Sequence, residues 1–338
     1  MHTLVTGGAG FIGSHLVELL LSEGHSVHVI DDLSTGRAAN IAGLRDHPKF
    51  EFNQADIVTW EGLWAAARSA ERVYHLAAVV GVRRVLDDPI GVLATNIAGT
   101  ERLLRAVSAG GRRPRMMLAS TSEVYGFSPN AAQAETDQLT FVAGNWARWS
   151  YAVTKLADEH LGNAYARERR LPIAIPRFFN MVGPRQRGRY GMVLPNFVRQ
   201  AVRGLPITVY GDGNQTRSFC DVRDGVRMIA EVTESSLGPG EVVNLGNDQE
   251  ISINHLAELV RRRADSSSTI IHRSYADGYG EHFDDVIRRR PDLTRLKSMI
   301  DFAPRWTLTG TIDNLIARER KGDATRAFPI DARVASED

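Results

Sequence analysis

A glycine-rich turn near the start of the chain limits the possible folds more than any other feature. The apolar run that begins at Leu4 breaks into glycines, and apolar residues then recur at helical spacing. This order predicts a strand, a glycine turn and a helix. Gly7 permits the tight turn, Gly10 lets a pyrophosphate approach the backbone, and Gly13 lets the helix lie close to the strand. The N-terminus of that helix offers unpaired N–H groups and its dipole to phosphates.

An acidic pair follows the next predicted strand, Val27–Ile30. Asp31 stands about twenty residues beyond the glycines, where a carboxylate can bind ribose hydroxyls. Asp31 and Asp32 together would repel a 2′-phosphate, so NAD is favoured over NADP. A glycine pattern alone is weak evidence, but here the strand, the helix, the second strand and the acid occur in order.

Composition excludes several classes of protein. The 338 residues include 41 basic and 40 acidic side chains, so nothing indicates a nucleic-acid or membrane partner. No apolar run is long enough to span a bilayer. Cys220 is the single cysteine, which excludes intramolecular disulfides and cysteine-rich metal sites, and we expect no metal. The first strand begins almost at Met1 and leaves no room for a signal peptide, so we expect a cytoplasmic protein.

Strand-like and helix-like segments alternate through the first half of the chain. This alternation predicts a Rossmann-type, doubly wound parallel sheet with helices on both faces. After about Phe179, glycines and prolines punctuate short segments, which is typical of a smaller mixed α/β domain. We therefore expect a cofactor domain over 1–178, a substrate domain over 179–321 with chain returns near Asn244, and a tail over 322–338. The predicted strands lie at 50–52, 72–78, 116–119 and 173–175, and the predicted helices at 96–107, 151–169, 253–263 and 311–320.

Tyr151 and Lys155 form the pair with the clearest chemical meaning. They are four residues apart in a predicted helix and so lie on one face. A neighbouring ammonium and a nicotinamide cation would lower the pKa of the phenol, so Tyr151 could act as a base near neutral pH. Alone, this spacing is commoner as a surface helix pair. Here it follows a strand that ends in hydroxyl residues, and the functional interpretation is favoured.

The sequence resembles the extended short-chain dehydrogenases/reductases that modify nucleotide sugars. The resemblance rests on TGGAGFIG at 6–13, HLAA at 75–78, STSEVYG at 120–126 and YAVTK at 151–155. RFFNMVGPRQ at 177–186 and VYGDGNQTRSFCDVRD at 209–224 extend it over about the first 230 residues, and RRRPD at 288–292 continues it more loosely. It implies NAD as cofactor, a UDP-sugar as substrate and a homodimer formed by the two long helices.

The resemblance also implies roles for individual residues. Tyr151 would remove the proton from O4 of the sugar while C4 gives its hydride to NAD, and Thr121 would share the O4 hydrogen bond. Asn180 and Arg217 would hold the diphosphate, and Tyr210 and the Thr208 backbone would contact the uracil. The expected catalytic residues are Thr121, Ser122, Glu123, Tyr151 and Lys155. The expected cofactor contacts are Gly7, Gly10, Phe11, Ile12, Gly13, Asp31, Asp32, Asp56, Ile57, Leu76, Ala77, Ala78, Asn96, Ser120, Tyr151, Lys155 and Phe178. The expected substrate contacts are Thr121, Ser122, Glu123, Tyr151, Asn180, Arg189, Val193, Leu194, Thr208, Tyr210, Gln215 and Arg217.

Oxidation at C4 is common to 4-epimerases, 4,6-dehydratases and uronate decarboxylases in this family. Ser122-Glu123 stands where glucose-type dehydratases carry Asp-Glu, which disfavours that reaction, although mannose-type dehydratases use Thr-Ser-Glu. Uronate decarboxylases also carry Thr-Ser-Glu and would place an arginine where Met192 stands. Arg189, three residues earlier, could bind a sugar carboxylate, or its basic run could be a solvated loop.

Our hypothesis from the sequence is a UDP-glucuronate 4-epimerase, an isomerase that would produce UDP-galacturonate through a transient 4-keto sugar. Because a 4-keto uronate is a β-keto acid, Arg189 would have to hold the carboxylate in a rotamer that does not lose CO₂. The alternatives are a UDP-glucuronate decarboxylase, a UDP-glucose 4-epimerase and a sugar dehydratase. A regulatory protein that binds the cofactor without turnover is disfavoured because the Tyr-Lys pair is intact.

Overall fold

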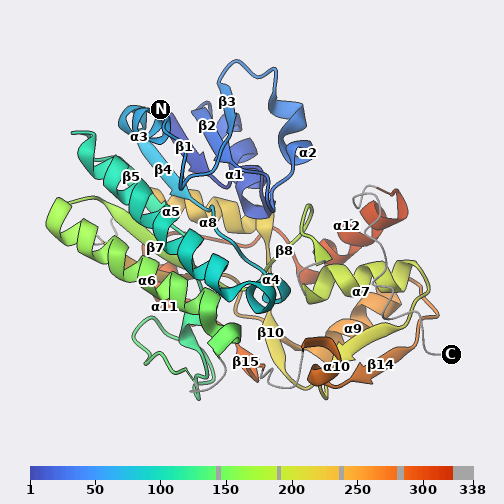
Figure 1. Cartoon of the computed structure of the whole chain (residues 1–338). Coiled ribbons are helices and arrows are strands. Elements are labelled where there is room, and N and C mark those ends of the chain that lie inside the picture. Colours follow the sequence, from blue (N-terminus) through green and yellow to red (C-terminus); the bar gives the residue numbers. More distant parts are fainter. Residues whose placement is uncertain (142–145, 189–191, 236–239, 280–284, 323–338) are drawn as a thin grey trace.

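A large parallel sheet forms the centre of the structure, a computed structural model that describes residues 1–141, 146–188, 192–235, 240–279 and 285–322 (Figure 1). The strand order is β12-β7-β5-β4-β1-β2-β3, with β6 also paired to β7, and neighbouring strands run parallel. This confirms the predicted Rossmann-type, doubly wound sheet. Its strands are β1 (His2–Thr6), β2 (Ser26–Asp31), β3 (Phe50–Gln54), β4 (Arg72–His75), β5 (Arg115–Leu118), β6 (Ser120–Thr121), β7 (Ile173–Phe178) and β12 (Glu241–Leu245).

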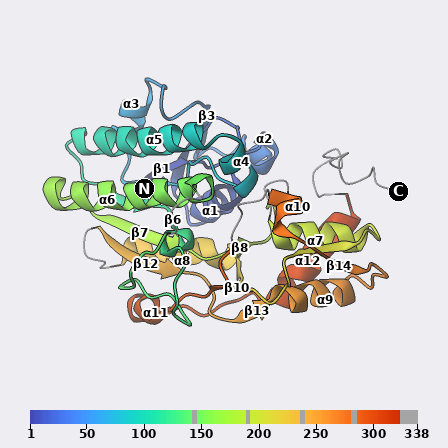
Figure 2. The same cartoon turned by 60° about the horizontal axis from the view of Figure 1, so that its bottom comes forward.

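Helices cover both faces of this sheet, as apolar side chains on both sides of its strands require. One cluster joins the sheet to α1 (Phe11–Ser22) and α8 (Val222–Glu234), through Leu16 and Ile229. The opposite cluster contains Leu103 and Ala166 and holds α5 (Pro89–Ala109) and α6 (Trp146–Arg169), which lie side by side (Figure 2). The remaining helices near this sheet are α2 (Ala38–Ile41), η1 (Ala42–Leu44), α3 (Leu63–Ser69), α4 (Val82–Asp87), η2 (Ser122–Tyr125) and α11 (Thr294–Met299).

A second group of elements has its own core, as predicted for the smaller mixed α/β part. Leu194, Ile207, Leu256 and Ile312 are fully buried in one cluster there. Among the described residues, three small sheets pair β10 with both β13 and β15, β14 with β9, and β11 with β8. The elements are β8 (Met181–Val182), α7 (Val193–Val202), β9 (Ile207–Tyr210), β10 (Thr216–Ser218), β11 (Cys220–Asp221), β13 (Glu250–Ser252), α9 (Ile253–Arg263), β14 (Ile270–Arg273), α10 (Tyr275–Tyr279), β15 (Arg288–Arg289) and α12 (Leu308–Arg320).

The element boundaries differ from the predicted ones mainly at helix starts. The helix predicted from 96 begins at Pro89, because proline suits the first helical position and the Asp88 carboxylate accepts a hydrogen bond from the Gly91 N–H. No helix was predicted over α8, although Val222, Val226 and Ile229 have helical spacing. α8 packs on the large sheet and β12 is one of its strands, so the division at residue 178 stays a prediction. Residues 323–338 of the predicted tail lie outside the described part.

Two surface features bear on partners. Ile90 on α5 is 79% exposed and Val153 on α6 is 43% exposed, so apolar side chains remain on the two long helices. The expected homodimer stays a prediction. Within the described ranges, every helix is too short or too polar to cross a bilayer.

A buried ion pair fastens α6 to the sheet. The carboxylate of Glu159 accepts two hydrogen bonds from the Arg177 guanidinium, at 2.8 and 2.7 Å, and a third from the Ser120 hydroxyl at 2.5 Å. Burial alone would lower the pKa of Arg177, but the hydrogen bonds and charge of Glu159 outweigh burial and raise it. The guanidinium also lies 4.7 Å from the centroid of the Tyr125 ring. The pair therefore fixes the helix that carries Tyr151 relative to the ends of β6 and β7.

Removing one partner of this pair should destabilise the fold strongly. We expect Glu159→Ala to lower the free energy of unfolding by about 3–5 kcal/mol, because it leaves Arg177 buried without a counter-charge. Denaturant titration measures this loss. The matched control is Glu101→Ala, which breaks the exposed Glu101–Arg105 pair on α5 and should cost less than about 1 kcal/mol. Equal losses in both variants would contradict this assignment.

Candidate active site

The glycine turn has the geometry that a dinucleotide phosphate requires. Gly7 has φ +73°, and a Cβ there would lie 2.6 Å from the backbone nitrogen of Ala77. A Cβ at Gly13 would overlap the carbonyl oxygen of Gly7. Gly10 precedes α1 in extended conformation, and no side chain caps the helix. The first N–H groups of α1, at Phe11 and Ile12, are thus left for an anionic ligand.

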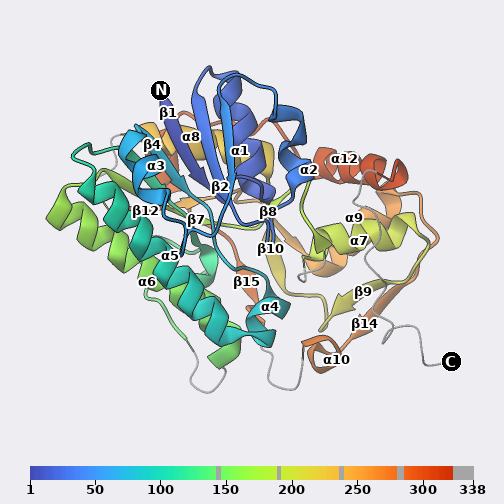
Figure 3. The same ribbon diagram turned by 45° about the horizontal axis from the view of Figure 1, so that its top comes forward.

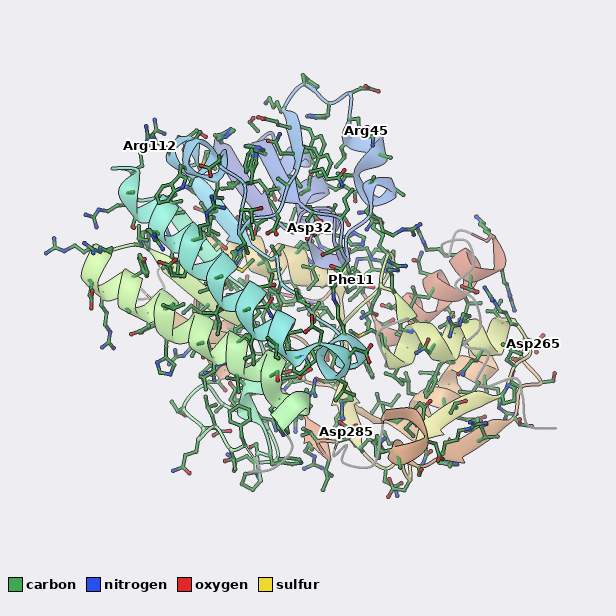
Figure 4. The ribbon with its side chains drawn as sticks, in the orientation of Figure 1. Phe11, Asp32, Arg45, Arg112, Asp265 and Asp285 are labelled. Atoms are coloured by element: carbon green, nitrogen blue, oxygen red, sulfur yellow. The ribbon has the colours of Figure 1, made fainter. Side chains whose placement is uncertain are left out.

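Asp31 fixes the turn as well as facing the expected ribose position. Its carboxylate accepts hydrogen bonds from the Ala9 N–H at 2.9 Å and from the Leu33 N–H at 2.8 Å. Burial raises the pKa of Asp31, while these two hydrogen bonds oppose the shift. Asp32 is exposed beside it, at the edge of the large sheet near Phe11 in Figure 4. The arrangement keeps a carboxylate at the end of β2, where a ribose hydroxyl can still donate to it.

The predicted adenine contacts lie at the end of the neighbouring strand β3. The Asp56 side chain is exposed and accepts a hydrogen bond from the Val58 N–H at 2.8 Å. Ile57 is almost buried, and its carbonyl accepts a hydrogen bond from Arg102 on α5 at 2.9 Å. Both residues therefore lie at the same sheet edge as Asp31, as a bound adenosine would require.

A buried polar chain supports the segment after β4. His75 is 1% exposed, and its ring nitrogens lie 2.7 Å from the Thr6 hydroxyl and 3.0 Å from the Thr100 hydroxyl. Burial, and then the charge of Lys155, lower the pKa of His75 to about 3. His75 is therefore neutral at physiological pH. The half-buried Leu76, Ala77 and Ala78 follow it, and the backbone of Leu76 and Ala77 lies against Gly7.

Asn96 ties two parts of the site together. Its amide bonds both the N–H and the carbonyl of Val79, at 2.7 and 3.1 Å, and donates to the Thr154 hydroxyl at 3.2 Å. Asn96 was expected to contact the cofactor, but both of its N–H groups are used by Val79 and Thr154. Its observed effect is to hold the segment after β4 against α6.

Lys155 is buried, and its ammonium donates to the Asp158 carboxylate at 3.1 Å. The expectation that Lys155 and a nicotinamide cation together lower the pKa of Tyr151 stays a prediction. Burial raises the pKa of the half-buried phenol, and the charges of Glu123 and Asp158 raise it further. The motif YAVTK ends at Lys155 and does not include Asp158, which stands three residues later on the same helix face.

The turn after β6 brings together the three other predicted catalytic residues. The Thr121 hydroxyl accepts a hydrogen bond from the Glu123 N–H at 3.3 Å. The Ser122 hydroxyl is buried and has no hydrogen-bond partner within the part of the chain that the structure describes. Because an unpaired buried hydroxyl is costly, this atom is suited to a ligand. Ser120, expected to contact the cofactor, is instead bonded to Glu159.

Arg289 completes the site and was missed by the sequence comparison. Its guanidinium lies 3.8 Å from the Glu123 carboxylate, and the two side chains are 13% and 18% exposed. Arg289 is paired in register with Arg217, since β15 runs parallel to β10. The only signal in the sequence was the loose match of RRRPD, which was assigned no role.

The guanidinium of Arg217 forms an ion pair with the carboxylate of Asp285. It donates to the Asp285 carboxylate at 2.7 Å, and the Tyr275 hydroxyl donates to the same oxygen at 3.0 Å. Figure 4 shows Asp285 near one end of α6. Gln215 donates to the Tyr275 hydroxyl at 2.9 Å and to the Tyr210 carbonyl at 2.8 Å. Arg217, Gln215 and Tyr210, which were expected to bind the substrate, therefore form one connected group through Asp285 and Tyr275.

The other predicted substrate residues are less closely connected. Asn180, with φ +29°, donates to the Ser218 carbonyl at 2.9 Å. The Thr208 N–H donates to Gln200 at 3.2 Å, and so is not free to read a uracil. Leu194 is fully buried, which leaves only its backbone for a ligand. Arg189 lies outside the described residues. Met192 and Val193 stand at the start of α7 and Phe178 ends β7, and all three are half-buried.

The assembled site joins a dinucleotide-binding edge to a phenol, a hydroxyl, a carboxylate and two arginines. The chain belongs to the NAD dependent epimerase/dehydratase family, whose model matches residues 3–246. This match confirms the expectation that the cofactor is NAD. The glycine turn and the free N–H groups of α1 fit its pyrophosphate, and Asp31 fits its ribose.

Several proteins similar to this chain are named for nucleotide sugars that carry a carboxylate. The chain is 36% identical over 302 residues to UDP-N-acetyl-alpha-D-glucosaminuronate decarboxylase of Bacillus cytotoxicus, covering 89% of this chain and 92% of that one. It is 35% identical over 318 residues to UDP-glucuronic acid decarboxylase 1 of Xenopus tropicalis, covering 94% and 72%. The solved UDP-glucuronic acid 4-epimerase of Bacillus cereus, in complex with UDP-glucuronic acid and NAD, superposes with a TM-score of 0.83 at 30% identity, covering 95% and 99%.

His75 should make the protein sensitive to acid. Because its folded pKa of about 3 lies below the unfolded value of 6.5, the unfolded chain binds a proton that the folded chain does not. Stability from this group is therefore complete above pH 6.5 and falls toward pH 3. Between pH 7 and 4.5 we expect a loss of about 2–3 kcal/mol that His75→Gln removes, measured by denaturant titration at both pH values. Parallel losses in the two proteins would contradict this assignment.

Asp158 should set the pH at which Tyr151 ionises. Asp158→Asn removes a negative charge that raises the phenol pKa, so the acid limb of kcat/KM against pH should move to lower pH by about one unit. Asp46→Asn, an exposed change of the same charge, should leave the profile in place. A shift to higher pH in Asp158→Asn would show that the Lys155–Asp158 pair acts on catalysis in some other way.

Proposed function

We propose that the protein is an NAD-dependent decarboxylase of a UDP-hexuronate. The observation that carries the proposal is the Glu123–Arg289 pair, which lies beside the reacting edge at Thr121 and Tyr151. Arginine binds a carboxylate with planar, two-pronged geometry, and Arg289 is therefore suited to the C6 carboxylate of the sugar. The relatives from Bacillus cytotoxicus and Xenopus tropicalis, which are UDP-hexuronate decarboxylases, support this choice.

Oxidation at C4 is the first step. Tyr151 takes the proton of O4, and the Thr121 hydroxyl shares the hydrogen bond to that oxygen. Bound NAD, held by the glycine turn and Asp31, would supply a reversible acceptor for the C4 hydride, so the reaction would involve no net oxidation. The sugar is then a β-keto acid, whose C5–C6 bond can break.

The charge of Glu123 would favour the loss of CO₂ from the substrate. A substrate carboxylate bound by Arg289 would lie next to the Glu123 carboxylate, and two like charges about 4 Å apart repel by about 4 kcal/mol at an effective dielectric constant of 20. Loss of neutral CO₂ removes this repulsion. The C5–C6 electron pair passes to C5 and, as the enolate, to O4, where the protonated Tyr151 and Thr121 stabilise it. C5 takes a proton from solvent, and Tyr151 gives its proton back to O4 when C4 is reduced again.

The 4-epimerase predicted from the sequence is the second candidate, supported by the likeness to the Bacillus cereus 4-epimerase. Both enzymes oxidise C4, but an epimerase must keep the C5–C6 bond intact and turn the keto sugar over. In that case an arginine would stabilise the carboxylate, and a neighbouring carboxylate such as Glu123 would oppose it. Arg289 replaces Arg189 and Met192 as the position on which this choice depends.

Product analysis by proton NMR tests the proposal. We expect UDP-glucuronate or UDP-N-acetylglucosaminuronate, incubated with enzyme and NAD, to give a UDP-pentose or its 4-keto form with equimolar CO₂. A galacturonate-type anomeric signal without CO₂ would establish the epimerase instead.

Glu123→Gln separates the two steps of the proposed reaction. Since it removes the charge but keeps the shape, we expect CO₂ release to fall about 10²–10³-fold, in line with the loss of a repulsion of a few kcal/mol. Oxidation at C4 should survive, so absorbance of reduced cofactor should accumulate when substrate is added. Glu51→Gln, on the exposed end of β3, is the matched control and should behave as the unchanged protein. Undiminished CO₂ release by Glu123→Gln would contradict the proposed role.

A further inference from the structure

A second pocket, of about 470 Å³, lies between α1, α8 and α12. Its lining comes from these helices, from the segment after β8 and from the loop before α12. None of the lining residues is among those assigned above to the cofactor or the substrate. α1 and α8 cover the sheet face opposite α5 and α6, so the pocket is separated by the sheet from the helix that carries Tyr151 (Figure 3).

The pocket is strongly basic. Five arginines and His15 line it, with Glu18 as the one acid. Arg185 is paired with Glu18, Arg223 with Asp221 and Arg227 with Asp224. Among the described residues, neither Arg305 nor Arg318 has an acidic partner. Two guanidinium groups in one pocket thus have charges that a ligand can neutralise, and phosphate is the group whose geometry suits them.

A flat aromatic surface lies beside these two cations. The guanidinium of Arg223 stacks on the indole of Trp306, 3.2 Å from the ring centroid, while 38% of Trp306 stays exposed. The loop is fixed because the backbone N–H groups of Arg305 and Trp306 donate to the Asp224 carboxylate, at 3.0 and 2.9 Å. A planar ring can stack on the open side of a preformed indole at little entropic cost.

Asn314 adds an unused acceptor. Its Oδ1 atom is buried and has no hydrogen-bond partner within the described ranges, although the residue lines the pocket. A buried acceptor without a donor is costly and is expected to be satisfied by a ligand group. The pocket therefore combines cations, an aromatic surface and a free acceptor in a volume typical of small-molecule sites.

We propose that this pocket is a second nucleotide-binding site. The phosphates of a nucleoside diphosphate would lie against Arg305 and Arg318, the base would stack on Trp306, and an amine or hydroxyl of the ligand would donate to Asn314. The proposal does not depend on which reaction the catalytic site performs, so the two can fail independently.

Calorimetric titration of the full-length, NAD-loaded protein with UDP tests the proposal. We expect two binding events per chain. Arg318→Glu should weaken one event at least tenfold and leave the other intact, whereas Arg217→Ala, in the catalytic site, should weaken the other. Arg112→Glu, the same charge change on the distant side seen in Figure 4, should alter neither event. One event per chain, or two events that Arg318→Glu leaves unchanged, would overturn the proposal.

Binding of inorganic pyrophosphate distinguishes a site that recognises a nucleotide from a site that binds any anion. Trp306→Leu should weaken the second UDP event about tenfold but leave pyrophosphate binding at that site unchanged, because only UDP has a base to stack. Catalytic turnover in both variants shows that they are folded, since neither residue belongs to the catalytic site. Equal UDP affinity before and after Trp306→Leu would overturn the assignment of the base to the indole.

Discussion

The hydrogen-bonded group of Glu159, Arg177 and Ser120 holds the catalytic part of the molecule together. It joins α6 to the ends of β6 and β7, and all three side chains are buried. Because a buried carboxylate tolerates little loss of its partners, α6 cannot slide or rotate without a large cost. Tyr151 and Lys155 stand about two turns and one turn before Glu159 on that helix. They are consequently fixed relative to Thr121 and Glu123. Buried contacts in the core of the protein therefore set the relative positions of the residues in the site.

The second group of elements contributes the cations that face this fixed edge. Parallel pairing of β10 with β15 places Arg217 beside Arg289, and each arginine faces an acid, Asp285 and Glu123 respectively. These acids neutralise one buried cation, Arg217, and one half-buried cation, Arg289. A ligand with a diphosphate at one end and a carboxylate at the other could bind both arginines. The pattern of charge therefore matches a nucleotide hexuronate better than a neutral sugar.

Local sequence patterns predicted the features that depend on local chemistry. The glycine turn, Asp31 and the Tyr151–Lys155 pair follow from short-range sterics and helix periodicity, and the structure places them at one sheet edge. Contacts between distant segments could not be predicted this way: nothing local in the sequence indicates that Arg289 meets Glu123. The pKa of Tyr151 likewise depends on more than local pattern, because burial and the charges of Glu123 and Asp158 raise it. The helical spacing of Val222, Val226 and Ile229 does indicate α8, so that helix is within the reach of local patterns.

We propose that the C5–C6 bond of a UDP-hexuronate breaks after oxidation at C4. The reaction run in D₂O tests this step most directly. Decarboxylation leaves a carbanion at C5 that takes one deuteron from solvent. We predict a UDP-pentose product with one deuterium at C5, seen by proton NMR and as a mass one unit higher than that of the product made in H₂O. A UDP-hexuronate product with all its carbon-bound protons retained would contradict the account and establish transfer of hydride alone.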